Sequence, residues 1–292
     1  MPTLRDIRQR IRGIESTKKI TKSMKTMALV RLQKQETRTR NSRHFSDTVT
    51  ELLSYLGEAL PEEILGSEPY FTHKPDAPEL WVVFTSDRGL CGAYNSNLLR
   101  FVDQELAVVQ KEGRSVEIIW IGLKGLQHAQ RRGHNIKSEH THLPAEPTHQ
   151  ISEEISKECQ KAFLEGGFGS VHLIYNFFRS VLKREFRKTR FLPVEYSSFR
   201  KGVGESFPLY LVEPNIQSML KQLIPLYLRT RMYQTLLESS ASEHAARMMT
   251  MEQATNNAES LLKDLTHAYH KARQSSITRE LVEVVNAAEA LS

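Results

Sequence analysis

Cysteine is nearly absent from this chain of 292 residues, which contains only Cys91 and Cys159. Two cysteines cannot form the framework of several disulfides that stabilises small secreted domains, so a reduced, cytoplasmic compartment is the simplest interpretation. No apolar run approaches the length of roughly 18 residues that a membrane-spanning helix needs. The amino terminus, MPTLRDIRQRIRG, has charges where a signal peptide has its apolar stretch, which argues against export.

Glycine and proline are scarce at both ends of the chain. Residues 3–56 contain no proline and a single glycine, Gly13, while the last section has no glycine after Gly204 and no proline after Pro225. Because these two residue types interrupt helices, their absence predicts one helix over 3–56 and another over 226–291. At 1.5 Å per residue the helices would be roughly 80 and 100 Å long, far longer than a globular domain is wide.

Both predicted helices carry residues at alternating three- and four-residue steps, the pattern of a coiled-coil seam. In the first helix the stripe slips at Lys18, which would alter the supercoil locally, and its members are Leu4, Ile7, Ile11, Ile14, Ile20, Met24 and Met27. In the second helix the stripe comprises Leu237, Ala241, His244, Met248, Met251, Thr255, Ala258, Leu262, Leu265, Tyr269, Ala272 and Ser276. The last turns, 281–291, are apolar nearly all round, which predicts burial on every side.

The middle of the chain alternates between two patterns. Apolar runs of strand length at 80–84, 116–121 and 171–178 are interleaved with helical stretches at 96–111, 123–132 and 150–165, and 180–196 resembles strands with a basic hairpin. Such alternation predicts a parallel, doubly wound sheet. The predicted fold class is therefore α/β: a Rossmann-like α/β domain (75–205) inserted between two long terminal helices (1–60 and 206–292) that form an antiparallel coiled coil.

The stretch 85-TSDRGLCGAYN-95 lies between a predicted strand and a predicted helix, where phosphate-binding loops occur. However, Gly89 and Gly92 do not fit G-x-G-x-x-G, and no G-K-[ST] follows. A tight turn with Asn95 or Ser96 as the helix N-cap is favoured over a nucleotide site. Cys91 could be activated at a helix N-terminus, but no base is identifiable, so an inert buried cysteine is favoured.

Four histidines, His134, His140, His142 and His149, raise the question of a metal site. No cysteine accompanies them and their surroundings resemble an exposed loop, so an ordinary polar loop is favoured. No paired-carboxylate, triad or metal motif stands out elsewhere. We therefore expect no catalytic, cofactor-binding or metal-binding residues and no cofactor.

Positive charge is concentrated in residues 1–44, which hold thirteen Lys or Arg and three acidic residues, whereas the whole chain has a net charge of +6. A segment of this kind favours a negatively charged partner. Nucleic acid is one candidate, which would make the chain a basic coiled-coil nucleic-acid-binding protein. An acidic protein surface is equally consistent with the charge alone.

Three stretches resemble the γ subunit family of F-type ATP synthases. They are 12-RGIESTKKITKSMKTMA-28, 86-SDRGLCGAYN-95, and 242-SEHAARMMTMEQATNNAESLL-262 with 271-KARQSSITRELVEVVNAAEAL-291. The resemblance implies a non-catalytic rotor, present in one copy, that couples rotation of a ring of c subunits, driven by protons or sodium ions, to ATP synthesis or hydrolysis in an α3β3 hexamer. The implied partners are α, β, ε and the c-ring, with no nucleic acid and no directly bound nucleotide.

The same resemblance implies roles for particular residues. Met24 and Lys25 would face an acidic segment of β, and Arg247, Arg273 and Gln274 would also contact β. The tail, with Val282, Val285 and Leu291, would sit in an apolar bearing of the hexamer, and Gly89 and Gly92 would form a structural turn. With no leader rich in Arg and Ser, the chain resembles bacterial members, which implies the cytoplasmic face of a bacterial membrane.

Overall fold

The chain is described by a computed structural model that covers residues 3–59, 68–72, 74, 77–180, 184–195, 213 and 215–289. Its elements, in chain order, are α1 (Leu4–Ala59), η1 (Pro69–Phe71), β1 (Glu79–Phe84), α3 (Tyr94–Lys111), β2 (Val116–Ile121), α4 (Leu123–Arg132), β3 (Ile136–His140), α5 (His149–Glu165), β4 (Ser170–Phe178), β5 (Arg184–Leu192) and α6 (Ile216–Glu289). They divide into two compact units, which we call the coil and the body. The coil comprises residues up to Leu29 and from Arg247 on, and the body comprises residues 30–246.

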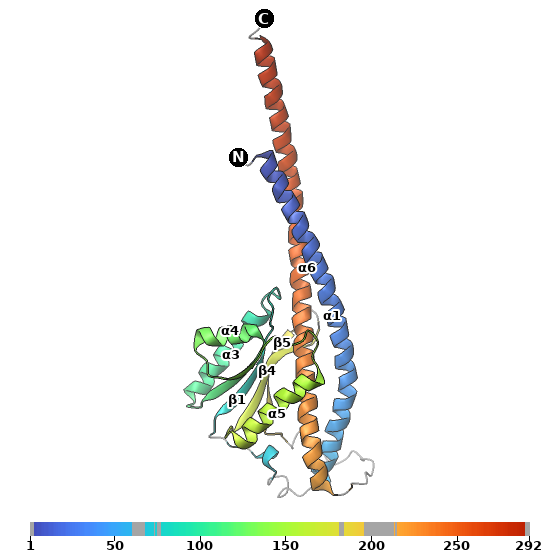
Figure 1. Ribbon diagram of the computed structural model, residues 1–292, viewed down its shortest axis with the longest axis vertical. Coiled ribbons are helices and arrows are strands. Elements are labelled where there is room, and N and C mark those ends of the chain that lie inside the picture. Colours follow the sequence, from blue (N-terminus) through green and yellow to red (C-terminus); the bar gives the residue numbers. More distant parts are fainter. Residues whose placement is uncertain are drawn as a thin grey trace. The chain divides into compact units, whose positions relative to one another are not determined.

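The body is built on a five-stranded sheet with the order β3-β2-β1-β4-β5. The first four strands are parallel, as predicted, and β5 pairs antiparallel with β4. Helices α3 and α4 cover one face of the sheet, and α5 lies on the other face (Figure 1). This arrangement confirms the predicted doubly wound α/β class.

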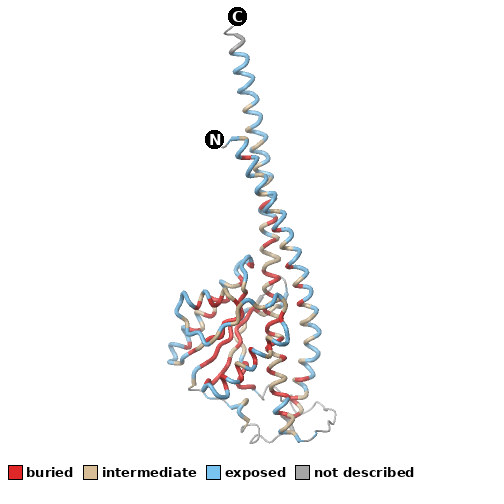
Figure 2. Tube along the Cα trace, viewed as in Figure 1, coloured by how far each residue is buried: buried red, intermediate tan, exposed pale blue. Residues whose placement is uncertain are grey.

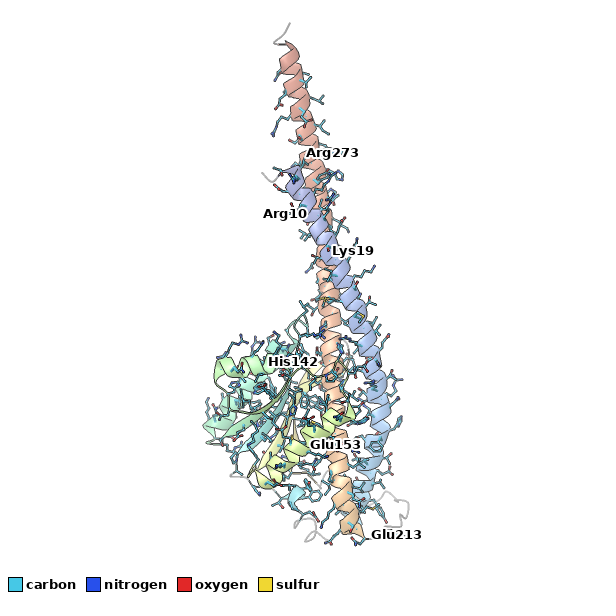
Figure 3. All side chains as sticks on the ribbon, viewed as in Figure 1. Arg10, Lys19, His142, Glu153, Glu213 and Arg273 are labelled. Atoms are coloured by element: carbon cyan, nitrogen blue, oxygen red, sulfur yellow. The ribbon has the colours of Figure 1, made fainter. Side chains whose placement is uncertain are left out.

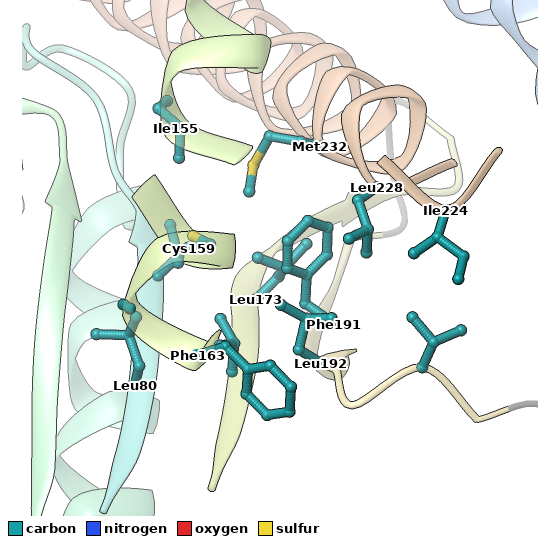
Figure 4. Close-up of a cluster of buried hydrophobic side chains, with 14 of the residues drawn as sticks. Leu80, Ile155, Cys159, Phe163, Leu173, Phe191, Leu192, Ile224, Leu228 and Met232 are labelled. Carbon is teal, nitrogen blue, oxygen red and sulfur yellow. The ribbon is translucent and has the colours of Figure 1, made fainter. Parts of the chain in front are cut away.

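Strand β1 is buried on both faces, which explains why its sequence is a continuous apolar run instead of an alternating one. Leu80, Val82 and Phe84 pack in a core that also contains residues of α1, α5 and α6, whereas Trp81 and Val83 pack in a second core with α3 and β2. Figure 4 shows the first core, where side chains of α5 and α6 meet the sheet. The part of α6 that precedes Arg247 in the sequence is therefore integral to the body.

Two boundaries and one strand differ from the sequence expectations. Helix α6 begins at Ile216 and contains Pro225 inside it, although the expected helix started after that proline. Helix α1 continues through Gly57 to Ala59. Strand β3 was missed because its sequence, IKSEH, is polar and largely exposed at the sheet edge, where it pairs only with β2.

The coil is an antiparallel pair of helices. Three side-chain pairs connect its two helices: Lys18 with Glu259, Thr21 with Thr255 and Lys25 with Glu252. Residue numbers increase along α1 while those of their partners on α6 decrease, as expected for antiparallel helices. The predicted seam on α6 is the more buried face, with Met251, Thr255 and Ala258 buried. Figure 2 shows mainly exposed residues towards the upper ends of both helices, in contrast to the body.

The predicted slip on α1 was wrong. The repeat passes without interruption through half-buried Lys18 and Lys25 and through buried Thr21 and Ala28, while Ile20 and Met27 are each 57% exposed. Polar residues are tolerated in this seam because the lysine stems pack and their ammonium groups reach carboxylates on α6. The threonine hydroxyls hydrogen-bond to each other across the seam.

Candidate functional site

The loop after β1 is held in place by one carboxylate. Asp87 accepts hydrogen bonds from the backbone N–H groups of Leu123 at 2.9 Å, His142 at 3.1 Å and Leu143 at 3.0 Å. Leu123 begins α4, where helix N–H groups lack partners within the helix. Asp87 therefore joins the segments that follow β1, β2 and β3.

A second set of hydrogen bonds closes the same loop on itself. The Asn95 amide accepts from the Ser86 N–H at 3.0 Å and donates to Ser86 Oγ at 2.7 Å and to Cys91 Sγ at 3.3 Å. The expected N-cap role of Asn95 or Ser96 was wrong, because α3 begins at Tyr94 and its N-cap residue is Ala93. Asn95 fastens the loop instead.

The two loop glycines differ in conformation. Gly92 has φ +59°, a left-handed value that favours glycine. Gly89 does not have a positive φ, and nothing lies within 4 Å of where a Cβ would stand. Leu90, at φ 62°, is 61% exposed at the loop surface. The conformational demand of the turn thus falls on Leu90 and Gly92.

The position where this sheet topology usually holds a ligand is filled by the chain itself. In doubly wound sheets that position lies outside the carboxyl ends of the strands, at the reversal of strand order next to β1. Here Tyr94, the first residue of α3, is 3% exposed, and its hydroxyl lies 3.1 Å from the Ser239 carbonyl oxygen and 2.9 Å from Ser239 Oγ. Cys91 and Ala246 pack beside it, and burial raises the pKa of the Tyr94 phenol.

The four histidines singled out in the sequence do not come together. His140 Nε2 pairs with Glu158 at 2.8 Å, a hydrogen bond that raises the pKa of His140, and the His149 ring stacks on Tyr233 with centroids 4.0 Å apart. His142 is held through its backbone by Asp87. His134 lies apart from these, beside Asp103 and His128.

The expected contact residues on α1 lie next to an exposed apolar surface. Met24 is half-buried, and Lys25 Nζ pairs with Glu252 at 2.6 Å. Ile20 and Met27, each about one turn from Met24 on the same side of the helix, are exposed. The sequence prediction placed both residues in the seam. If the repeat of the first heptads continues unchanged through Lys18, both residues fall outside the seam, as the structure shows.

The expected contact residues on α6 are spread along the helix. Arg247 is half-buried, and Arg273 and Gln274 are exposed. Figure 3 shows Arg273 on α6, and Arg10 and Lys19 on α1, projecting from the helices. Arg247 and Arg273 are separated by roughly 40 Å along the helix axis at 1.5 Å per residue. These residues cannot surround one small ligand and instead suit an extended macromolecular surface.

The tail of α6 is exposed, with Val282 at 51% and Val285 at 54%. Ile277, Leu281 and Val284 are exposed as well. At 100° per residue, these five apolar residues cover roughly 160° of the helix surface. The opposite side carries Arg279, Glu280 and Glu283. The described part of the tail is therefore less apolar all round than expected, and Leu291 lies outside the described residues.

Comparison with known proteins gives a consistent result along the whole chain. A family model described as ATP synthase matches residues 3–291. The γ chain of the ATP synthase of Halothermothrix orenii is 35% identical over 100% of both chains. That of Chloroherpeton thalassium is 34% identical over 100% of this chain and 99% of its own length.

Solved structures with the same fold are also similar. A chain of the Tetrahymena thermophila mitochondrial ATP synthase central stalk and c-ring structure is 27% identical, with a TM-score of 0.59, over 80% of this chain and 99% of its own length. A chain of the Euglena gracilis mitochondrial enzyme is 18% identical, with a TM-score of 0.69, over 99% and 94% respectively. Among the helices in the described residues, none has the length and apolarity needed to cross a membrane.

Proposed function

This chain belongs to the family of ATP synthase γ chains, and from that premise we propose that it is the rotor of a rotary ATP synthase. In this proposal it couples rotation of an ion-driven c-ring to ATP synthesis or hydrolysis in an α3β3 hexamer. The observation that carries the proposal is the coil, in which two long helices pair with each other and still leave apolar side chains exposed along their length.

The coil can select among conformations of its neighbours because its circumference is uneven. One side of α1 presents Ile20 and Met27, whereas cations such as Lys19 and Lys22 project elsewhere around the helix. A rotor shifts the conformation of a neighbouring subunit only by the difference in contact energy between its states. Turning an uneven surface past β subunits in equivalent positions supplies such a difference without any chemistry in the rotor.

The individual contact residues fit this proposal in different ways. Lys25 is already paired with Glu252, so the exposed Lys19 and Lys22 supply much of the attraction to an acidic β segment. Met24 lies on another side of α1, next to Ile20 and Met27. Higher on α6, Arg273 and Gln274 are exposed for polar contacts with β. We keep Arg247 as a contact with β on the family resemblance.

The tail supplies a different kind of contact. The exposed valines Val282 and Val285, and Leu291 beyond the described residues, would turn inside an apolar sleeve of the hexamer. Apolar contacts are non-directional, so they hold the tail with little dependence on its rotation angle.

The remaining parts of the proposal concern chemistry and location. ATP turnover belongs to α and β, and this chain, present once per complex, binds no cofactor or nucleotide itself. Support comes from Tyr94 and α6, which fill the position where nucleotides bind in related sheets. The ε subunit and the c-ring would contact the body, at the cytoplasmic face of a bacterial membrane.

The test is reconstitution with α and β subunits. We expect the full chain to change the ATPase rate of the assembly, and a chain truncated after Ser275 to lose most of that change. An ATPase rate that does not depend on this chain would contradict the rotor proposal. Retention of the isolated chain on DNA or RNA, lost between 50 and 200 mM salt, would instead favour the nucleic-acid-binding alternative.

A matched pair of substitutions tests the tail without truncation. Val285→Asp introduces a charge at a tail residue that is 54% exposed, and Val108→Asp does so at a residue of the body that is 53% exposed. Both substitutions should leave the isolated chain folded, because both sites face solvent. We expect only Val285→Asp to weaken assembly or turnover, and equal effects would remove the tail from the contact surface.

A further inference from the structure

Three potential metal ligands come together in the body: Asp103 on α3, His128 on α4, and His134 just after the end of α4. His128 Nε2 lies 2.9 Å and 3.2 Å from the two carboxylate oxygens of Asp103, and His134 Nε2 lies 3.4 Å from Oδ1. One ligand atom from each residue lies within 4.8 Å of the others. The side chains are 14% to 28% exposed, so an ion could enter from solvent and then be largely enclosed.

The end of α4 places His134 in this group. Gly133 has φ +71°, and the His134 N–H bonds back to the Ala129 carbonyl at 3.1 Å, which are features of a Schellman helix end. This reversal returns the chain towards the last turns of α4, where His128 lies. The His134 ring then stacks on Trp120, with centroids 6.0 Å apart and planes at 15°.

The two ring nitrogens of His134 have different surroundings, and Nε2 is the one that faces the other two residues. Nδ1 is buried and has no hydrogen-bond partner among the described residues, while Nε2 points to the carboxylate shared with His128. Two imidazoles and one carboxylate thus bring one possible ligand atom each to within 4.8 Å of the others.

We propose that Asp103, His128 and His134 bind a divalent transition metal ion of the Zn²⁺ class. Imidazole nitrogen with one carboxylate oxygen is a donor set that such ions prefer. Bonds of about 2.05 Å in a tetrahedron put ligand atoms roughly 3.3 Å apart. The His134–Asp103 distance of 3.4 Å already matches, and the His128–Asp103 distance of 2.9 Å requires a small opening.

Three protein ligands leave the fourth tetrahedral position to water or to a group from outside the chain. The bound ion would tie the end of α4 to the middle of α3, two helices that cover the same face of the sheet (Figure 1). This site is separate from the coil and from the loop after β1. It departs from our expectation, from sequence, of no metal-binding residues.

One neighbouring charge opposes the ion. Arg132 Nε lies 4.0 Å from Asp103 Oδ2, and its side chain is 66% exposed. The guanidinium can therefore swing into solvent when an ion enters, at some cost in affinity. This gives a substitution that should strengthen binding, Arg132→Gln, alongside those that should abolish it.

The experiment is a titration of the full chain, without a histidine tag and treated with chelator, with Zn²⁺ by calorimetry and with Co²⁺ by visible absorption and tryptophan fluorescence. We expect one equivalent to bind with a dissociation constant on the order of 1 µM. Asp103→Asn and His134→Gln should weaken binding by more than about 100-fold. Arg132→Gln should tighten it roughly fivefold. His44→Gln, which removes an exposed histidine of α1, should change nothing.

Two outcomes would overturn the proposal. One is binding by His134→Gln or Asp103→Asn within twofold of the unsubstituted chain, or no saturable binding by that chain. The other requires no substitution: bound Co²⁺ must quench fluorescence because the His134 ring stacks on Trp120, one of two tryptophans, so unchanged emission places the ion elsewhere. This second measurement decides the matter even if the ligand variants fail to fold.

Discussion

The body and the coil use the same two helices in opposite ways. In the body, Leu228, Met232 and Leu237 of α6 are completely buried. In the coil, Leu262 and Leu265 lie on the predicted seam but are only half-buried, and beyond Ser276 every residue of α6 with a described side chain is exposed. The difference shows that the body completes its own core, whereas the coil leaves apolar surface for another molecule to cover.

The two regions also differ in what fills the contact between the helices. In the body, α1 and α6 contribute leucine, methionine and other aliphatic side chains to a large core that they share with the sheet. In the coil most buried positions are small or polar, as at Thr21, Ala28, Thr255 and Ala258, and the larger apolar ones are Ile7 and Met251. Small residues let helices approach closely but bury little area, and most helical stability in proteins comes from buried area. We therefore expect the coil to be the less stable of the two regions.

The largest effect should follow from opening the core of the body. Phe191 on β5 is fully buried beside Leu228 and Leu192 (Figure 4). Phe191→Ala should lower the free energy of unfolding by about 3–5 kcal/mol, since it removes contacts and leaves a cavity. The control is Phe45→Ala, at a residue of α1 that is 52% exposed, which should change stability by less than about 0.5 kcal/mol in denaturant titrations. Equal effects would contradict the contrast between buried core and exposed helix.

A second prediction concerns the stability of the body in acid. Burial lowers the pKa of His172 to about 4, against the opposing effect of Glu79, whose Oε2 lies 3.5 Å away; Lys188, Arg190 and Arg114 also lower it. The unfolded chain binds this proton near pH 6.5, so the contribution of His172 is present above that pH and is lost as pH falls towards about 4. The loss should be about 1–3 kcal/mol. Denaturant titrations at several pH values should show that the free energy of unfolding depends less steeply on pH in His172→Gln than in the unsubstituted chain.

The pKa of His140 is shifted in the opposite direction to that of His172, so His140 serves as the control for that measurement. Hydrogen bonding to Glu158 raises the pKa of His140 and lowers that of Glu158. Stability from this pair is greatest between about pH 4.5 and 6.5. It is lost as pH rises through the raised pKa of His140, and it is also lost as pH falls through the lowered pKa of Glu158. Because both side chains are partly solvated, the effect should be below about 1 kcal/mol. Parallel pH slopes for His172→Gln and His140→Gln would contradict this assignment.

A smaller effect should come from the polar seam of the coil. Thr255 Oγ1 lies 2.9 Å from Thr21 Oγ1 and 2.7 Å from the Met251 carbonyl. Thr255→Val should cost about 1 kcal/mol, and Thr21→Val with Thr255→Val should cost less than the sum of the single changes, because the hydrogen bond between the two hydroxyls can be lost only once. Hydrogen exchange along the coil measures both. Strict additivity would mean that the two hydroxyls do not interact across the seam.

The smallest effect should come from the ion pairs that border the seam. Lys25 and Glu252 are 35% and 46% exposed at their side chains, so solvent screens their attraction. Lys25→Met keeps the apolar stem and should change stability by less than about 1 kcal/mol, with the difference vanishing in high salt. Thermal unfolding at low and high salt tests this. A large loss that does not depend on salt would contradict the assignment of Lys25 and Glu252 as a solvent-screened ion pair.

Elements with a regular residue pattern could be predicted from the sequence, but hydrogen bonds between distant segments could not. The helices, the buried strands and the seam on α6 follow from periodicity and from the absence of glycine and proline. Asp87 and Tyr94 could not be assigned, because their partners lie far along the chain and no local pattern announces them. The heptad register of α1 was predicted wrongly at Ile20, because an apolar residue can lie either in the seam or on an exposed surface.

The unbroken seam on α1 has a mechanical consequence. A repeat of seven residues in a helix of 3.6 residues per turn drives a left-handed supercoil. A left-handed two-stranded rope is wound more tightly when torque is applied in one sense, and its strands are loosened when torque is applied in the other. With no stutter to absorb the twist in residues 4–28, the torsional stiffness of the coil should depend on the direction of rotation, so energy stored elastically during synthesis and during hydrolysis should differ.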